Sequence, residues 1–77
     1  METIKITTPF IKLDQFLKFA DIVENGSDAK YIILLGCVSV NDEEELRRGR
    51  KLYPGDVVHV VYEDADITVK VCDWLCI

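Results

Sequence analysis

The spacing of the apolar residues changes near Cys37, from three or four positions to two, and this change constrains the fold more than any other feature. Before it, the spacing follows one face of a helix, first at Leu13, Phe16, Leu17 and Ala20 and again at Ala29, Ile32 and Ile33. After it, apolar and polar residues alternate as in a half-buried strand, as at Val38 and Val40. With only 77 residues, both parts must share one modest core. We therefore expect a single α+β domain over residues 1–77.

Turn and capping residues set the expected limits of the two helices. The first helix follows Pro9. Ser27 is expected to cap the second helix, which then begins near Asp28, where a carboxylate favours the positive end of the helix dipole. Gly36 suits the left-handed residue that often ends a helix. The two helices are therefore expected to be short and closely linked.

Strands are expected on both sides of the helix pair. Residues 2–7 alternate polar and β-branched side chains, which is typical of a strand. The strand at 38–40 is followed by Asn41-Asp42, a turn pair that tolerates positive φ. The runs 57–62 and 67–71 are separated by a short acidic turn and are expected to form a hairpin. The expected order is strand, helix, helix, strand, strand, strand.

The net charge of −5 is unusual for a nucleic-acid binder, because such proteins carry cations that neutralise phosphates. The cations are nevertheless concentrated in one place. Four of the nine stand within five consecutive positions, at Arg47, Arg48, Arg50 and Lys51. The acids gather at 42–45 and 63–66. Because a local patch matters more than the total charge, a nucleic-acid partner stays open.

The expected compartment follows from the absence of a membrane span and of a secretory leader in the sequence. The sequence has no apolar run near the roughly 20 residues that span a bilayer, and its start lacks a secretory leader, so we expect a cytoplasmic protein with no membrane partner.

The three cysteines, Cys37, Cys72 and Cys76, form no Cys-x-x-Cys pair. This argues against a disulfide framework and a tetrahedral zinc site. We expect reduced, mostly buried thiols, although Cys72 and Cys76 are spaced as a possible redox pair.

Catalytic residues are not expected. His59 stands in a β-branched run with no adjacent nucleophile, and the chain has no glycine-rich phosphate loop. The acidic run 42–45 is interpreted as a solvated loop and not as an acid and base pair. The sequence therefore predicts no metal, no cofactor and no small-molecule substrate.

Several short motifs occur in a fixed order along the chain. They are Leu13-Asp14, Leu17, Ala29-Lys30, Gly36-x-Val38-x-Val40-Asn41 and Gly55-Asp56-x-Val58. In this order and spacing they resemble the S4 RNA-binding domain family, over about residues 11–60. The stretch Arg47-Arg48-Gly49-Arg50-Lys51-Leu52 is similar to the small stand-alone S4 proteins in particular.

The resemblance implies an alpha-L fold, in which two short helices form an L and pack on a small, mostly antiparallel sheet. It also implies that the helices and the following turn meet the backbone of structured RNA. The chain departs from the family pattern at Asp21 and Asp42, where relatives often have glycine, and has only Lys30 where relatives have arginines early in the second helix.

The cations at 47–51 are the predicted RNA contacts. Arg47, Arg48 and Arg50 carry guanidinium groups that form bidentate hydrogen bonds to phosphate, and Lys51 adds a fourth positive charge. The alternative is that these cations balance the acids at 42–45 as solvated surface ion pairs of little energetic value.

Secondary contacts are predicted on neighbouring elements. Lys12, Lys18 and Lys30 are candidates for phosphate, and Gln15 and Asn41 are candidates for ribose hydroxyls. An ordinary helical ion pair between Asp14 and Lys18 explains those two residues equally well. Tyr31 and Tyr53 have the chemistry to stack on bases, but we expect them to fill the core.

The function predicted by the resemblance is non-catalytic binding of ribosomal or transfer RNA, with ribosome association. One rival is a protein–protein adaptor that has kept the scaffold and lost RNA affinity. In that case the acidic residues would bind a basic partner such as a ribosomal or replication protein.

A second rival is a β-grasp sulfur carrier. Val40-Asn41-Asp42-Glu43, Leu52 and Gly55-Asp56-x-Val58 are also similar to the turn and final strand of that family. Such carriers need a terminal Gly-Gly, whereas the sequence ends Trp74-Leu75-Cys76-Ile77. We therefore rank this alternative last.

Overall fold

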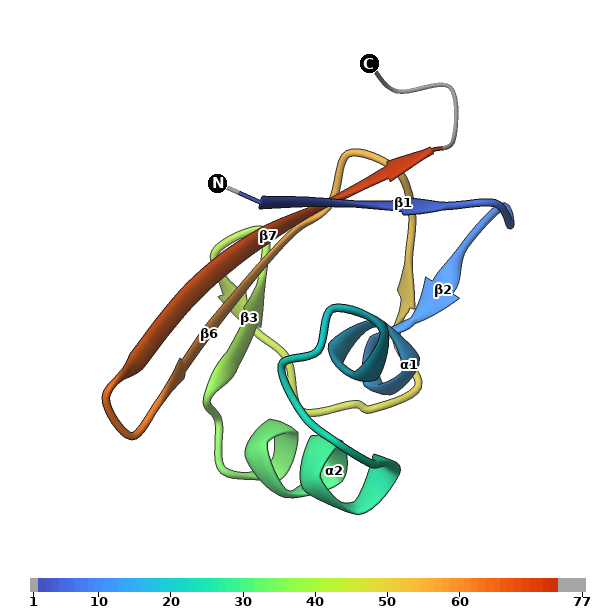
Figure 1. The fold of residues 1–77 in the computed structure, drawn as a ribbon. Coiled ribbons are helices and arrows are strands. Elements are labelled where there is room, and N and C mark those ends of the chain that lie inside the picture. The colour runs from blue at the N-terminus through green and yellow to red at the C-terminus, as the bar shows by residue number, and fades with distance from the viewer. Residues whose placement is uncertain (1, 74–77) are drawn as a thin grey trace.

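The computed structural model of the protein describes residues 2–73. It is an α+β fold in which two helices, α1 (Leu13–Phe19) and α2 (Gly26–Leu34), pack against a sheet (Figure 1). The sheet consists of β1 (Glu2–Ile6), β3 (Val38–Val40), β4 (Glu43–Glu44), β6 (Val57–Tyr62) and β7 (Ala65–Asp73), in the order β1-β7-β6-β3-β4. A separate two-stranded sheet joins β2 (Ile11–Lys12) to β5 (Lys51–Leu52). Only the β1–β7 pair is parallel among the pairings of residues 2–73, so the mostly antiparallel architecture is confirmed.

The core lies between the helix pair and the long strands. The predicted helical faces are buried there, and Leu13, Phe16, Leu17 and Ile33 are fully inaccessible. The alternating residues of β3, β6 and β7 face them, namely Val38, Val40, Val58, Val60, Val69 and Val71. The change of apolar period near Cys37 therefore marks the passage from the helix layer to the sheet layer.

Both helices end in the same hydrogen-bonded motif, with a left-handed residue just after the last turn. At the end of α1, Asp21 has φ of 61°, its N–H donates to Lys18 O, and Ile22 N–H donates to Leu17 O. At the end of α2, Gly36 has φ of 80° and occupies the equivalent position. This pattern satisfies carbonyls that the helix leaves free, and it favours glycine. The positive φ of Asp21 therefore explains in physical terms why glycine is favoured at this position.

The start of α2 differs from the sequence prediction. The helix begins at Gly26, and its cap is Asn25, whose side-chain Oδ1 accepts a hydrogen bond from Asp28 N–H at 2.9 Å. The prediction of Ser27 as the cap is therefore wrong. Asn caps helices as well as Ser does, and Asn25 has the correct spacing from the free amide of Asp28.

The turn between β3 and β4 follows the prediction. Asn41 and Asp42 are its two central residues, with φ of 53° and 69°. Positive φ at both positions defines the tight turn that matches the twist of a hairpin. The hairpin of β6 and β7 is also confirmed, with Val58 opposite Val69 and Tyr62 opposite Ala65.

Three strands of two residues each, β2, β4 and β5, were not predicted from the sequence. Two residues are too few to show a periodic pattern, and their pairing depends on tertiary contacts.

The expectation that Tyr31 and Tyr53 fill the core is also wrong, because their exposed fractions are 56% and 50%. Each instead contacts another ring at the surface: Tyr31 meets Tyr62 edge-on, and Tyr53 lies tilted against Phe10.

The cysteines differ from one another. Cys37 is free and half-buried. Cys72 is buried and disulfide-bonded, so the expectation of a reduced thiol is wrong there. The missing Cys-x-x-Cys pair argued against a framework of disulfides, but it did not exclude a single bond. The third cysteine of the prediction, Cys76, lies outside the described residues.

Candidate nucleic-acid interface

The basic segment, residues 47–51, is attached to the beginning of α1 through its backbone. Leu13 N–H donates a hydrogen bond to Arg50 O at 2.8 Å, and Asp14 N–H donates to Arg48 O at 3.0 Å. The first amides of a helix have no partner within the helix, and the residue at the cap position, Lys12, offers no side-chain cap. The carbonyls of the basic segment take over that role. The positions of its arginines are therefore tied to the helix.

A second attachment comes from the small sheet. Ile11 pairs with Leu52, and Lys12 pairs with Lys51, so two ammonium groups start from directly opposite backbone positions. Leu52 is fully buried, and the alternation of side chains along a strand turns Lys51 outward. The Lys51 ammonium lies 4.8 Å from the centre of the Phe10 ring, a favourable cation–π distance. The end of the basic segment is thus fixed to β2.

Glu45 anchors the other end of the segment from inside. Its carboxylate is almost fully buried and lies 3.0 Å from Arg47 Nε and 2.8 Å from Arg50 Nη1. Hydrogen bonds from the Arg47 side chain, with further ones from Arg50 and the Arg47 N–H, lower the pKa of Glu45 from 4.5 to about 2 despite its burial. The carboxylate is therefore ionised at neutral pH. The prediction of a solvated acidic loop is wrong for Glu45, although Asp42, Glu43 and Glu44 are exposed as expected.

The four cations of the segment consequently divide into two kinds. Arg47 and Arg50 share the Glu45 carboxylate, and Arg50 is the more deeply held, with 28% of its side chain exposed. The alternative proposed ion pairs with the acids at 42–45, but it proposed solvated surface pairs, whereas the Glu45 side chain is nearly buried. Arg48 and Lys51 are exposed, and within residues 2–73 neither makes an ion pair. Arg48 and Lys51 are therefore not engaged by a carboxylate of the described residues and are available to a ligand.

The remaining predicted residues are spread over the fold. Gln15 is exposed in the first turn of α1, next to the docked segment. Lys18 is half-buried in the last turn of α1, and Lys30 is exposed on α2. The structure thus brings Lys12 and Gln15 to the basic segment by way of β2 and the start of α1. Lys18 and Lys30 belong to other parts of the helix pair.

Asn41 has a structural role. Its Nδ2 donates to Asp56 Oδ1 at 3.1 Å, and its Oδ1 accepts from Val57 N–H at 3.0 Å. Both ends of the amide are therefore used to hold the β3–β4 turn to the start of β6. The ion pair considered for Asp14 and Lys18 is not among those of the described residues; Asp14 Oδ1 instead accepts from Gln15 N–H at 2.8 Å.

Other chemistry is sparse in the described part of the chain. His59 is a residue of β6, as predicted, and its Nε2 lies 2.6 Å from Asp66 Oδ1 at the surface. No group of three or more His, Cys, Asp or Glu side chains is placed to hold a metal ion within residues 2–73. In the same range, no helix is both long enough and apolar enough to cross a membrane.

Sequence reasoning missed three features of this surface: the capping carbonyls, the Phe10 ring below Lys51, and the buried Glu45. One signal was present for the first. Lysine is a poor cap, so Lys12 before the predicted helix indicated that another group must satisfy the first amides. Glu45 follows three exposed acids, and no feature of the sequence distinguished it from them as a buried residue.

Comparison with known proteins agrees with this architecture. The model of the family described as S4 domain matches residues 4–70. The probable ribosome maturation protein RlbA of Bacillus subtilis (strain 168) is 53% identical over 57 residues, which cover 74% of this chain and 80% of the relative. The match to the family model spans both helices, the basic segment and most of the sheet. The chain belongs to the S4 domain family.

Proposed function

We propose that this protein is a non-catalytic module that binds structured RNA through its phosphate backbone. The observation that carries the proposal is the docking of the basic segment on α1, with Arg50 O and Arg48 O capping the helix. Because the backbone that carries the cations is fixed before any ligand arrives, less conformational entropy is lost on binding. Membership of the S4 family supports RNA as the ligand.

The proposed contact surface is centred on Arg48 and Lys51. Both are exposed and make no ion pair within residues 2–73, and Lys12 stands opposite Lys51. Gly49 has nothing within 4 Å of the position of an added Cβ, so the backbone between the arginines is open to a close approach. Guanidinium groups bind phosphate oxygens in a fixed planar geometry. The segment is therefore suited to RNA shape more than to base sequence.

Other residues extend this surface in the proposal. Gln15 is next to the segment and has the donor and acceptor groups that a ribose hydroxyl requires. Lys18 and Lys30 add positive charge along the helix pair. Arg47 and Arg50 contribute charge and also hold the loop through Glu45. Asn41 is exposed and holds the β3–β4 turn through one N–H and one lone pair of its amide, so in the proposal its second N–H is available to a ribose hydroxyl.

The partner is proposed to be ribosomal RNA in an assembling particle, in the cytoplasm. The relative from Bacillus subtilis supports this setting, because it is named as a probable ribosome maturation protein. Transfer RNA also has folded, double-stranded elements that a protein can recognise through the phosphate backbone, so it is the second proposed ligand.

The proposal is tested by titrating the protein into fluorescently labelled fragments of ribosomal RNA and into transfer RNA at low ionic strength. A DNA duplex of matched length is the control for non-specific attraction. We expect saturable binding to RNA that weakens as salt is added, because counterions are released when phosphates are neutralised. Failure to bind either RNA at low ionic strength would remove the proposal.

A further inference from the structure

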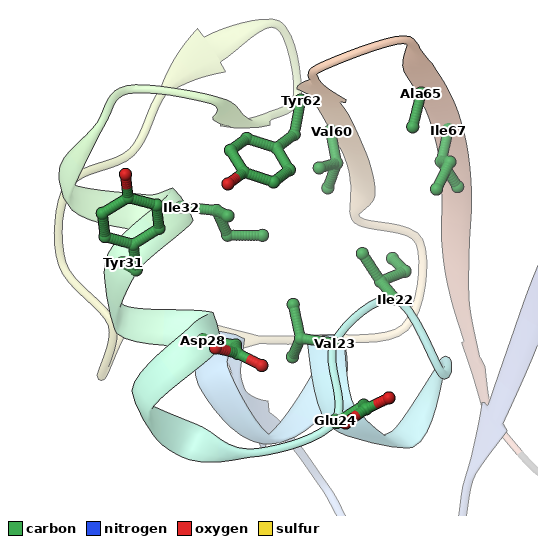
Figure 2. Close-up of a pocket in the computed structure, with 10 residues that line it drawn as sticks. All are labelled: Ile22, Val23, Glu24, Asp28, Tyr31, Ile32, Val60, Tyr62, Ala65 and Ile67. Carbon is green, nitrogen blue, oxygen red and sulfur yellow. The ribbon is translucent and has the colours of Figure 1, made fainter.

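A concave surface lies on a part of the fold that does not include the basic segment. A pocket of about 340 Å³ opens between the α1–α2 loop, the first turns of α2 and the β6–β7 hairpin (Figure 2). Its walls are mainly apolar: Ile22, Val23, Ile32, Val60 and Ile67 line it together with the Tyr31 and Tyr62 rings. The two rings meet edge-on, with centroids 6.3 Å apart. A cavity of this kind is large enough for one large apolar side chain of a partner.

Two carboxylates line this pocket, and further acidic residues stand in the adjoining hairpin turn. Glu24 and Asp28 line one edge, across from Tyr62 and Ala65 of the hairpin (Figure 2). Ala65 is flanked by Asp64 and Asp66, and Tyr62 is followed by Glu63. Withdrawal from water, together with the charges of Glu63 and Asp28, raises the pKa of Tyr62. The pocket therefore lies in a region of negative potential.

Most of these carboxylates have no counter-ion in the described part of the protein. The ion pairs of residues 2–73 join Glu45 to Arg47 and Arg50, and His59 to Asp66. Glu24, Asp28, Glu63 and Asp64 are all exposed and lie outside those pairs. Glu24 and Asp28 in the lining of an apolar pocket, with Glu63 and Asp64 in the adjoining hairpin turn, are complementary to a ligand that is both positive and apolar.

The acidic pocket and the basic segment are built from different elements. The pocket uses the α1–α2 loop, α2, β6 and β7, whereas the segment is held by β2, β5 and the start of α1. Two ligands of opposite charge can therefore be bound without sharing a residue.

We propose that this pocket binds a basic peptide segment of another protein, which places one large apolar side chain in the pocket and lysine or arginine residues at the rim. The apolar walls supply burial of the anchor side chain, and Glu24 and Asp28 supply the charge complementarity, with Glu63 and Asp64 of the adjoining turn adding negative charge. The protein then joins a basic protein to an RNA, with one partner on each surface. The peptide site itself does not depend on the proposed RNA function.

The test uses fluorescence anisotropy with three short labelled peptides. The first has a central leucine flanked by lysines, the second has alanine in place of the leucine, and the third has glutamates in place of the lysines. Because burial of a leucine side chain contributes about 1.5 to 3 kcal/mol, the leucine peptide is expected to bind at least roughly tenfold more tightly than the alanine peptide. The acidic peptide is expected not to bind.

Three variants locate the site. Ala65→Trp fills the mouth of the pocket and is expected to weaken binding of the leucine peptide roughly tenfold, to the level of the alanine peptide. The double change Glu24→Gln and Asp28→Asn removes two rim charges and is expected to weaken binding roughly fivefold. The double change Asp42→Asn and Glu43→Gln alters net charge equally at the β3–β4 turn and is expected to leave peptide binding unchanged.

Circular dichroism and thermal melting show whether each variant is folded, and RNA titration shows whether the other surface is intact. Equal affinities for the leucine and alanine peptides would overturn the proposal, because attraction would then rest on charge alone. Equal weakening by the two double variants would overturn it for the same reason. Dimerisation in light scattering that Ala65→Trp abolishes would also overturn it, because a second copy of the chain would then be the occupant.

Discussion

Glu45 Oε1 lies 2.8 Å from Arg50 Nη1, and the glutamate side chain that makes this contact is almost completely buried. The same carboxylate accepts hydrogen bonds from Arg47 through both its backbone and its side chain. Arg48, between the two paired arginines, is left outside this network and is exposed. Glu45 thereby fixes the loop and leaves Arg48 available to a ligand.

Replacing this carboxylate by an amide is expected to destabilise the protein. Glu45→Gln keeps the size of the side chain but loses the charge that the two arginines share, and we expect a loss of about 1 to 2 kcal/mol in the free energy of unfolding. Urea denaturation measures the change. The control is Glu43→Gln, an exposed position in β4, for which we expect no measurable effect. Equal stabilities of the two variants would contradict the structural role of Glu45.

The contribution of Glu45 is expected to depend on pH in acid. Its pKa is lowered from 4.5 to about 2 in the folded protein, so the unfolded chain takes up the proton first as the pH falls. The stabilisation is therefore complete above pH 4.5 and is lost as the pH falls towards about 2. We expect the difference in unfolding free energy between the wild type and Glu45→Gln to shrink across that window. A difference that stays constant would show that the folded carboxylate titrates normally.

The correct cap of α2 is distinguished by two alanine substitutions. Asn25→Ala removes the acceptor for Asp28 N–H and is expected to lower stability by about 1 kcal/mol. Ser27→Ala changes an exposed residue inside the first turn and is expected to have little effect. Thermal melting of both variants tests this assignment. The reverse order of stabilities would restore Ser27 as the cap.

Asp21 provides a test of the backbone at the end of α1. Its φ of 61° is costly for any residue with a Cβ, less so for Asp than for Ala. We expect Asp21→Gly to be more stable than Asp21→Ala by about 1 kcal/mol, because glycine adopts this conformation without strain. Chemical denaturation of the two variants checks the difference. If alanine is as stable as glycine, residue 21 does not require positive φ.

Residues with a local signal were predicted well from the sequence. The helical faces from Leu13 to Ile33, the alternating valines of the sheet and the left-handed conformation of Gly36 all depend on short-range spacing or on backbone sterics. The S4 motifs supplied the topology, which spacing alone did not determine. The predicted cap of α2, Ser27, lies two residues after the observed cap, Asn25. Both side chains can accept a hydrogen bond from a free helix amide, so the sequence did not distinguish them.

The details of the candidate interface depend on contacts between distant segments. Residues 48 and 50 meet residues 13 and 14 only after folding, and the resulting hydrogen bonds use backbone atoms that are common to every residue type. The burial of Glu45 is a tertiary effect of the same kind. The pocket near Tyr62 joins the α1–α2 loop to a hairpin some 40 positions later, and its acids looked like ordinary solvated residues. Sequence spacing reports none of these arrangements.

The most direct test of the central claim compares two charge-matched double variants in an RNA titration over a series of salt concentrations. Arg48→Gln with Lys51→Gln removes the two exposed cations of the basic segment and spares the pair of Arg50 with Glu45. Lys5→Gln with Lys70→Gln removes two exposed cations from β1 and β7. Both carry the same net charge, so a difference between them reports position.

We predict that the first variant binds ribosomal RNA more weakly than the second and has a shallower dependence on salt, by roughly 0.7 to 0.9 in the logarithmic slope for each phosphate that the protein no longer neutralises. The second variant should retain nearly the wild-type slope. If both variants lose affinity and slope equally, binding follows net charge, and the basic segment is not the RNA site.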